Sequence, residues 1–330
     1  MKLTTSRLKP VVATCALALW LSLPLTAFGQ AWPSRPVSVV IPFAAGGTTD
    51  NEARLYTQKL QEFTGQPFVF DFRPGAGTSI GLAFVAKAAP DGYTLVMINS
   101  GLTVHPHFYA SLPYDVMKSF APISLMSNRA TGLMINAAAL PNVRSLADLV
   151  VHARANPGAL SCNTAGSGSI THIVCAALAA ETKTDIVPVH YKGVSQGQTD
   201  LLAGRTQVQA GTIFNYQAMI KSGKLRLIAV LTEERSPLMP DVRTAAEQGV
   251  NVDFPSWLGV LGPAGLPQPV ITRLHAELVK AVRSPEVSRQ LEAGGSTPVG
   301  STPEAFRARM ARELAQWKKI VQENNIKGES

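Results

Sequence analysis

A segment near the start of the chain combines residue types that can bind an anion without a charged side chain. Residues 37–41 form a β-branched run typical of a buried strand, and residues 42–47 break it with a proline and two glycines. Thr48, Thr49 and Asp50 then supply the residue types that cap helices. A strand that turns into a helix leaves backbone N–H groups unpaired and directed at one spot, which attracts anions. Because residues 42–50 contain no Lys, Arg or His, neutral amide dipoles would hold that anion.

Two further glycine turns share this composition. Residues 75–81 and 166–169 each lie between an expected strand and an expected helix. Hydroxyl side chains add hydrogen-bond donors in the three turns, namely Thr48, Thr78, Ser79, Ser167 and Ser169. Each bond contributes only about 0.5–1.5 kcal/mol net, so an anion needs several together. One such turn is explained by backbone geometry alone, whereas three favour a binding site.

The sequence contains only weak matches to the motifs of nucleotide-binding proteins and of serine hydrolases. The glycine spacing in 75–81 misses GxGxxG by one residue, and no GxxxxGK[ST] run occurs. Ser169 and His172 lie three residues apart without the GxSxG pattern of a nucleophile elbow. We interpret Ser169 as a helix cap and His172 as a cleft or packing residue, with a secreted serine hydrolase as the alternative. Tyr191 and Lys192 could line a cleft or lie in solvent.

Alternating strands and helices would position these turns. The expected strands are 37–41, 68–72, 93–98, 133–135, 160–163, 186–189 and 208–210. The expected helices are 51–63, a segment after Gly81 that ends at about 88, 145–156, 170–181 and 199–203, with Ser145 as a cap. The pattern indicates two α/β units, each a mainly parallel sheet flanked by helices. Ligands bind at the carboxyl edge of such sheets.

The C-terminal part is helical. Residues 267–283 are amphipathic, and Thr302 and Pro303 open a last helix. Its apolar stripe contains Phe306, Met310 and Trp317. We therefore interpret Trp317 as a packing residue.

The first 29 residues resemble a secretory signal peptide. Lys2, Arg7 and Lys9 precede an apolar run over 11–25, and small residues follow at 27 and 29. That run is shorter than the roughly 20 residues that a membrane-spanning helix needs. We expect a mature protein outside the cytoplasm that begins near Gln30 or Trp32. Removing three cations lowers the formal charge of +8 to about +5, which does not suggest nucleic acid.

Two cysteines remain in the mature chain, Cys162 and Cys175. A disulfide and two buried thiols are both compatible with their positions at a strand end and in the next helix. The chain has no metal-ligand spacing, and we expect no metal and no cofactor.

Taken in order, the segments resemble the Bug receptors, which are the extracytoplasmic solute-binding proteins of tripartite tricarboxylate transporters. The matching segments are 32–36, 42–50, 73–77, 89–95, 112–115, 120–123, 166–169 with His172, 191–193, 200–204, 222–226, 240–242, 245–249, 257–259 and 263–265. They cover essentially the whole mature chain.

The resemblance implies a two-lobed periplasmic binding protein of type II that catalyses no reaction and holds a small carboxylate between its lobes. The predicted ligand-binding residues are Phe43, Ala44, Gly46, Gly47, Thr48, Asp50, Gly77, Thr78, Ser100, Gly166, Ser167, Gly168, Ser169, His172, Tyr191 and Asp200. Phe43 would form an aromatic wall, and Asp50 would cap its helix or orient the loop. Lobe 1 would comprise residues 30–129 and 250–330, and lobe 2 residues 130–249, with crossings near 128–131 and 238–254.

The resemblance also implies partners. The expected partners are the membrane subunits of a tripartite tricarboxylate transporter or, alternatively, a sensor kinase, with the receptor itself a monomer. The sequence departs from the family pattern at Ala44 and Ala45 and at residues 194–199, where the cleft should be lined. The identity of the ligand therefore cannot be transferred. Ser195, Gln196 and Gln198 hint at a more polar or altered ligand.

Overall fold

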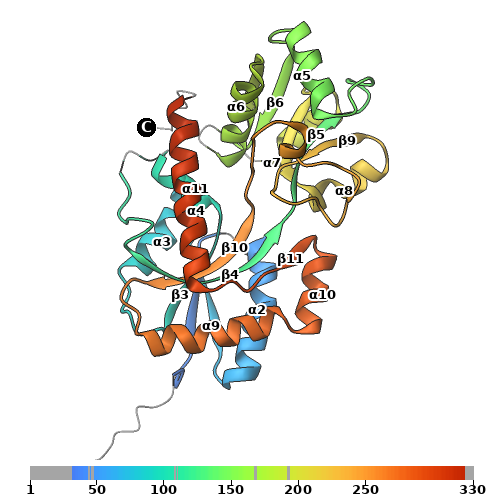
Figure 1. Ribbon diagram of the computed structural model, residues 1–330. Helices are drawn as coiled ribbons and strands as arrows, with labels where there is room; N and C mark the ends of the chain where they lie inside the picture. The colour runs from blue at the N-terminus through green and yellow to red at the C-terminus, as the bar shows by residue number, and fades with distance from the viewer. Residues whose placement is uncertain are drawn as a thin grey trace, which may run out of the picture.

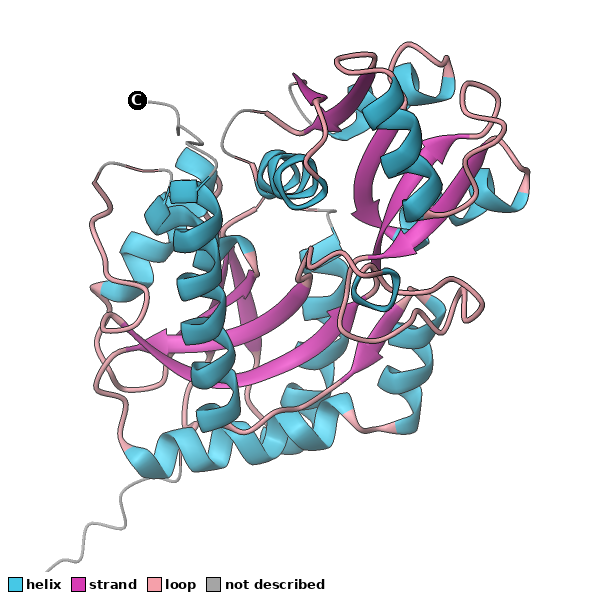
Figure 2. Cartoon of the chain, turned by 45° about the horizontal axis from the view of Figure 1, so that its top comes forward, coloured by secondary structure: helices cyan, strands magenta, loops and turns pink. Residues whose placement is uncertain are grey.

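The computed structural model describes residues 32–43, 45, 48–107, 109, 111–166, 169–191 and 194–323. The predicted signal peptide lies outside these residues, as do Ala44, Gly46, Gly47, Ser167 and Gly168. The described chain folds into two lobes, each built on one β-sheet with helices on both faces (Figures 1 and 2).

Lobe 1 contains a six-stranded sheet with the order β11-β4-β10-β3-β1-β2. Its strands are β1 (Val37–Ile41), β2 (Phe68–Phe72), β3 (Thr94–Asn99), β4 (Phe120–Arg129), β10 (Trp257–Pro263) and β11 (Ser296–Pro298). One face is covered by α2 (Thr48–Thr64), α9 (Gln268–Val282) and α10 (Pro285–Ala293). The other face is covered by α3 (Ser79–Ala86), α4 (Gly101–Val104) and α11 (Pro303–Glu323).

Lobe 2 contains a five-stranded sheet with the order β7-β6-β8-β5-β9. Its strands are β5 (Thr131–Asn136), β6 (Leu160–Thr164), β7 (Ile186–His190), β8 (Val208–Thr212) and β9 (Leu225–Val230). Helices α5 (Leu146–Ala155) and α6 (Ile170–Thr182) pack on one face, and α7 (Val194–Leu202) and α8 (Ile213–Lys221) pack on the other.

Both sheets are mixed, which corrects the expectation of mainly parallel sheets. The pairs β1–β2, β1–β3, β6–β7 and β6–β8 are parallel, as the strand–helix alternation predicts. The pairs of β10 with β3 and β4, of β11 with β4, and of β5 with β8 and β9 are antiparallel. The reversal arises because the strands nearest the crossings, β4–β5 and β10, run from one sheet toward the other. The two-lobed α/β class itself is confirmed.

The chain passes between the sheets twice. Only Ala130 separates β4 from β5, and the return path runs from Val230 to Trp257. At this junction the Arg129 N–H donates to the Ser256 carbonyl over 2.7 Å, and the Thr131 hydroxyl donates to the Phe254 carbonyl over 2.7 Å. The two crossing segments are therefore bonded to each other, and we call them the hinge.

Helix α11 contacts both lobes. Phe306 and Met310 are fully buried in the core of lobe 1, as the apolar stripe predicts. Trp317 is fully buried between Val104 of α4 and Ile173 of α6, which confirms its packing role. Figure 1 shows α11 running from the six-stranded sheet toward α6.

A disulfide joins Cys162 of β6 to Cys175 of α6, with a Cα–Cα distance of 6.0 Å. Both residues belong to the core cluster of lobe 2 and are at most 1% exposed. The sequence left disulfide and free thiols open, and the structure contains the disulfide.

Candidate functional site

A cleft of about 700 Å³ lies between the lobes at the hinge. Lobe 1 contributes the ends of β1, β2 and β3, and lobe 2 contributes the ends of β6 and β8. The lining residues are Pro42, Phe43, Pro74, Gly75, Thr78, Asn99, Ser100, Gly101, Val104, His105, Tyr109, Arg129, Ala165, Ser169, Ile170, Thr212, Phe254 and Ser256. The cleft therefore lies where strand ends of both sheets meet, as expected for open α/β sheets.

The described lining is electrostatically one-sided. It contains Arg129 and His105 but no acidic residue. Burial lowers the pKa of His105 to about 4, so the imidazole is neutral at neutral pH. Its Nδ1 lies 3.1 Å from the Tyr114 hydroxyl. Arg129 is therefore the one cation among the described lining residues, and its charge is compensated by the buried Glu52 carboxylate 2.9 Å away. The lining thus presents hydrogen-bond donors and no described carboxylate of its own, which suits an anionic ligand.

Phe43 forms part of the lobe 1 wall. It follows β1 directly, is half-buried, and packs against the apolar clusters on both faces of the lobe 1 sheet. Helix α2 begins at Thr48, five residues further along the chain. Phe43 lines the cleft, and its role as an aromatic wall stays a prediction, as do the intervening glycines.

Asp50 lies in the first turn of α2 and is 2% exposed. Its Oδ1 forms an ion pair with Arg54 Nε at 2.9 Å, one turn further along the helix. The carboxylate is thus directed at a helix neighbour, and Asp50 is not among the residues that line the cleft.

Thr78 holds an unusual backbone conformation at the cleft. It precedes α3 with φ of 83°, and Ala76 two residues earlier has φ of 44°. Side chains other than glycine rarely adopt this left-handed region, and such strain clusters at functional sites. The Thr78 Oγ1 is buried and has no hydrogen-bond partner among the described residues. Thr78 lines the cleft, and Gly77 precedes it in the same turn. The role of both residues in ligand binding stays a prediction.

Ser100 also lines the cleft, but its hydroxyl is engaged. Its Oγ donates to the Pro255 carbonyl over 2.7 Å, which ties the end of β3 to the hinge. The side chain is 5% exposed. Its position is close to the hinge, and its role in binding stays a prediction.

Ser169 caps α6, as interpreted from the sequence. Its Oγ accepts from the His172 N–H over 3.2 Å and donates to the Gly166 carbonyl over 2.7 Å. The same oxygen lies 3.0 Å from Thr171 Oγ1. Ser169 lines the cleft through this cap, and its hydroxyl is oriented by the turn rather than by a base.

The His172 ring contacts His190 rather than Ser169. The two imidazoles pack edge to face with centroids 4.5 Å apart. Burial first, and then the charge of His190, lower the pKa of His172. His190 Nδ1 lies 2.7 Å from Thr164 Oγ1, at the end of the neighbouring strand. This pair supports the strand ends that carry the cleft, and neither histidine is among the lining residues.

Tyr191 and Asp200 form a hydrogen bond with each other. The Tyr191 hydroxyl donates to Asp200 Oδ2 over 2.8 Å, and Arg205 Nη1 donates to Oδ1 over 2.8 Å. The hydrogen bond from Tyr191 and then that from Arg205 lower the pKa of Asp200. Neither Tyr191 nor Asp200 is among the residues that line the cleft.

Sequence reasoning missed several lining residues. They include Arg129, His105, Tyr109, Thr212, Phe254 and Ser256. Arg129 carried a usable signal, because it is a lone cation within the largely apolar run 120–136. Phe254 and Ser256 are placed by the pairing of the two crossing segments at the hinge, which the sequence pattern did not resolve. Thr212 ends β8, and His105 and Tyr109 lie in and after the short helical turn that follows α4.

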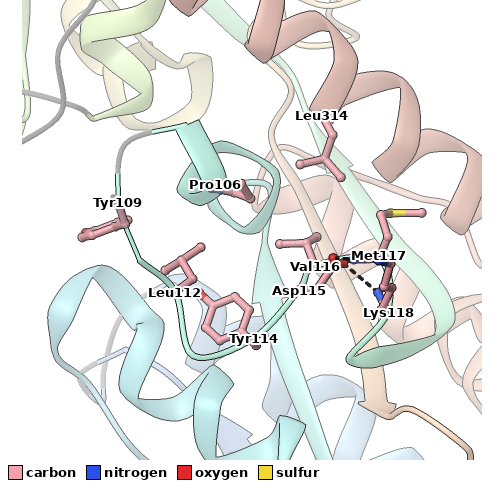
Figure 3. Close-up of a pocket in the computed structure, with 9 residues that line it drawn as sticks. All are labelled: Pro106, Tyr109, Leu112, Tyr114, Asp115, Val116, Met117, Lys118 and Leu314. Carbon is pink, nitrogen blue, oxygen red and sulfur yellow. Dashed lines mark hydrogen bonds and ion pairs between the residues drawn. The ribbon is translucent and has the colours of Figure 1, made fainter.

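A second cavity of about 480 Å³ lies on lobe 1, between the segment after α4 and helix α11 (Figure 3). Its walls include Leu112, Tyr114, Val116 and Leu314. Tyr109 lines both this cavity and the cleft. The cavity is more apolar than the cleft and presents fewer hydrogen-bonding groups.

The described residues contain neither a candidate metal site nor a candidate membrane-spanning helix. No group of three or more His, Cys, Asp or Glu in that part of the chain is arranged to hold a metal ion. Among the same residues, no helix has the length and apolar character needed to cross a membrane.

Two α/β lobes joined by a paired hinge around a polar cleft define a solute-binding receptor. Residues 53–326 match the profile of the family described as "Tripartite tricarboxylate transporter family receptor". The chain belongs to this family.

Several known proteins are similar to this chain over nearly its full length. Protein BugT of Bordetella pertussis is 33% identical over 330 residues, which is 98% of each chain. The structure of R. palustris Rpa4515 with adipate is 31% identical with a TM-score of 0.76, covering 90% of this chain and 100% of that one. MatC from Rhodopseudomonas palustris with bound malate is 29% identical with a TM-score of 0.72, covering 88% and 100%.

Proposed function

We propose that this receptor captures a small carboxylate in the interlobe cleft and closes around it for uptake. The observation that carries the proposal is the lining itself, in which one buried cation and several neutral donors face a cavity with no described acidic side chain. The relatives with adipate and malate support a carboxylate as ligand.

Neutral donors suit a receptor that must release its cargo. The Thr78 hydroxyl and the N-terminus of α6 at Ser169 would contact one carboxylate from opposite lobes. A hydrogen bond to a charged group contributes about 1.5–3 kcal/mol, so a few of them give micromolar binding without a covalent or metal bond. Because the donors come from both lobes, the ligand would bind the closed arrangement better and shift the population toward it.

The receptor would act without catalysis. The Ser169 hydroxyl serves as a helix cap and is not directed at the His172 ring, so the serine hydrolase alternative lacks its relay. We place lobe 1 at residues 30–129 and 250–330 and lobe 2 at 130–249, with residues 1–29 removed on export to the periplasm. The closed receptor would then dock on the membrane subunits of its transporter.

Binding is tested by calorimetry against mono-, di- and tricarboxylates, with sugars and amines as controls. A micromolar or tighter carboxylate is expected. A receptor that binds only sugars or cations would refute the proposal.

The cleft is tested by Thr78→Val, which keeps the branched shape and removes the unpartnered hydroxyl. We expect about tenfold weaker carboxylate binding, equivalent to about 1.4 kcal/mol. The free energy of unfolding should stay constant or rise, because a buried hydroxyl without a partner destabilises the unliganded fold. The matched control is Thr57→Val in α2, whose hydroxyl donates to the Ala53 carbonyl over 3.0 Å and should leave binding unchanged. Equal affinity in wild type and Thr78→Val would remove Thr78 from the site.

A further inference from the structure

Arg129 is held by a buried network at the end of β4. Its Nε donates to Glu52 Oε1 over 3.0 Å, and its Nη2 lies 2.9 Å from the same oxygen. Ser127 donates to Glu52 Oε2 over 2.6 Å, and Ser296 also hydrogen-bonds Glu52 Oε1. Both charged side chains are 9% exposed. The guanidinium is therefore fixed in position before any ligand arrives.

Part of the guanidinium remains available. Arginine has five N–H donors in a planar fork. Glu52 takes the edge formed by Nε and Nη2, and it does so through a single oxygen atom. Nη1 donates to no described residue, so its two N–H groups are unused on a side chain that lines the cleft.

Arg129 lines two cavities, and acidic residues lie in only one of them. The smaller cavity, of about 210 Å³, contains Glu233, which pairs with Arg309, and Glu234. No acid lines the cleft among the described residues, and His105 is neutral at neutral pH. The remaining lining near the hinge consists of Ser256, Phe254 and Thr212. An acidic group of the ligand is the partner whose shape and charge match the free edge of the guanidinium.

We propose that Arg129 is a specificity-determining residue that binds a second acidic group of the ligand, so that the receptor selects dicarboxylates. The inference rests on the proposed function, in which the first carboxylate lies between Thr78 and the Ser169 cap. The second carboxylate would then lie at the hinge, where both crossing segments meet. Phe43 and Phe254 would contact the apolar part between the two charged ends.

The test compares each diacid with its own monomethyl ester, which keeps length and shape and removes one charge. The probes are adipate and terephthalate with their monomethyl esters, measured by calorimetry at pH 7.5. Wild type should bind the better diacid about 10- to 100-fold more tightly than its ester, the range expected for a charge-assisted hydrogen bond. Benzoate and hexanoate are included as monocarboxylates.

The variant Glu52→Gln/Arg129→Gln removes both charges and leaves no buried ion without its partner. Its ratio of ester to diacid dissociation constants should fall to near one, while ester binding stays within about threefold of wild type. The matched control is Glu52→Gln, which retains the cation and should retain the preference. Circular dichroism and the thermal midpoint establish that both variants fold.

The outcomes separate the two proposals. Equal binding of diacid and ester by wild type, or a preference that survives in the double variant, overturns the role of Arg129 and leaves carboxylate capture intact. Binding of benzoate or hexanoate without any diacid has the same meaning. Failure of every carboxylate overturns both proposals.

Discussion

The disulfide of lobe 2 should contribute most of its stabilisation through the unfolded chain. Cys162 and Cys175 are 13 residues apart in sequence, so the bond closes a ring of about 14 residues. The chain-entropy relation gives a loss of about 10 cal/mol/K for such a ring, or about 3 kcal/mol at 25 °C. Reduction should therefore lower the free energy of unfolding of lobe 2 by about 3 kcal/mol.

Equilibrium unfolding in guanidinium chloride, followed by far-ultraviolet circular dichroism, measures this difference. Wild type is compared with and without excess dithiothreitol, because the reduced protein keeps both sulfur atoms and loses only the crosslink. Both cysteines are at most 1% exposed, so samples must be incubated until the signal no longer changes. The matched control is Cys162→Ala/Cys175→Ala, whose transition should not respond to the reductant.

Two results would contradict this reasoning. A wild-type transition that is unmoved by reductant would mean that the ring does not restrict the unfolded chain. A shift of similar size in the double alanine variant would mean that the reductant acts elsewhere. A shift well above 3 kcal/mol would indicate that the bond also supports packing of α6 on β6.

Two further predictions concern charge and capping. Burial raises the pKa of Asp253 to about 6, against the attraction of Arg309, and its Oδ1 has no hydrogen-bond partner among the described residues. The folded pKa lies above the unfolded value, so the free energy of unfolding falls as pH rises from about 4 to about 6. Asp253→Asn removes this titration. The variant should therefore raise the free energy of unfolding by on the order of 1–3 kcal/mol at pH 7.5 and by little at pH 4. Thermal midpoints at both pH values check this, and an equal gain at both would exclude titration as the cause. Ser145 and Asp148 form a capping box on α5, with bonds of 3.1 and 3.0 Å. Ser145→Ala should cost about 1 kcal/mol in chemical denaturation and leave carboxylate affinity unchanged, and a loss of affinity would show that α5 is coupled to the cleft.

Local patterns predicted the elements that depend on local chemistry. Strand β2 matches the predicted range 68–72, and α9 and α6 begin and end within one residue of their predicted ranges. The Ser145 and Ser169 caps were predictable because a cap is decided within one helical turn.

The antiparallel half of each sheet was less predictable. Strand β10 is buried throughout and lies between β3 and β4, so its place depends on pairing over long sequence separations. A continuous buried run does not indicate strand direction. For the same reason Arg129 was missed, since its link to Glu52 joins residues 77 positions apart.

The glycine turns were predictable in part. Their order of strand, turn and helix predicted which segments would meet at the lobe interface, and Thr78 and Ser169 both line the cleft. Tyr191 and Asp200 were selected by resemblance, and in the structure their polar atoms contact each other. A motif can therefore mark a segment near the site without identifying which side chain faces the cavity.

Because α11 is attached to both lobes, a rotation about the hinge must also disturb the contact that α11 makes with lobe 2. Arg309 lies 3.6 Å from Glu233 at the hinge, and Trp317 lies eight residues further along, about 12 Å along the helix axis. Because Trp317 lies this far from the hinge, a change in the angle between the lobes must slide or separate Trp317 and Ile173. Trp317 is fully buried, so the work of moving this contact enters the free-energy difference between open and closed receptor. Two receptors with identical clefts could thus differ in apparent affinity through the energy of this interlobe contact alone.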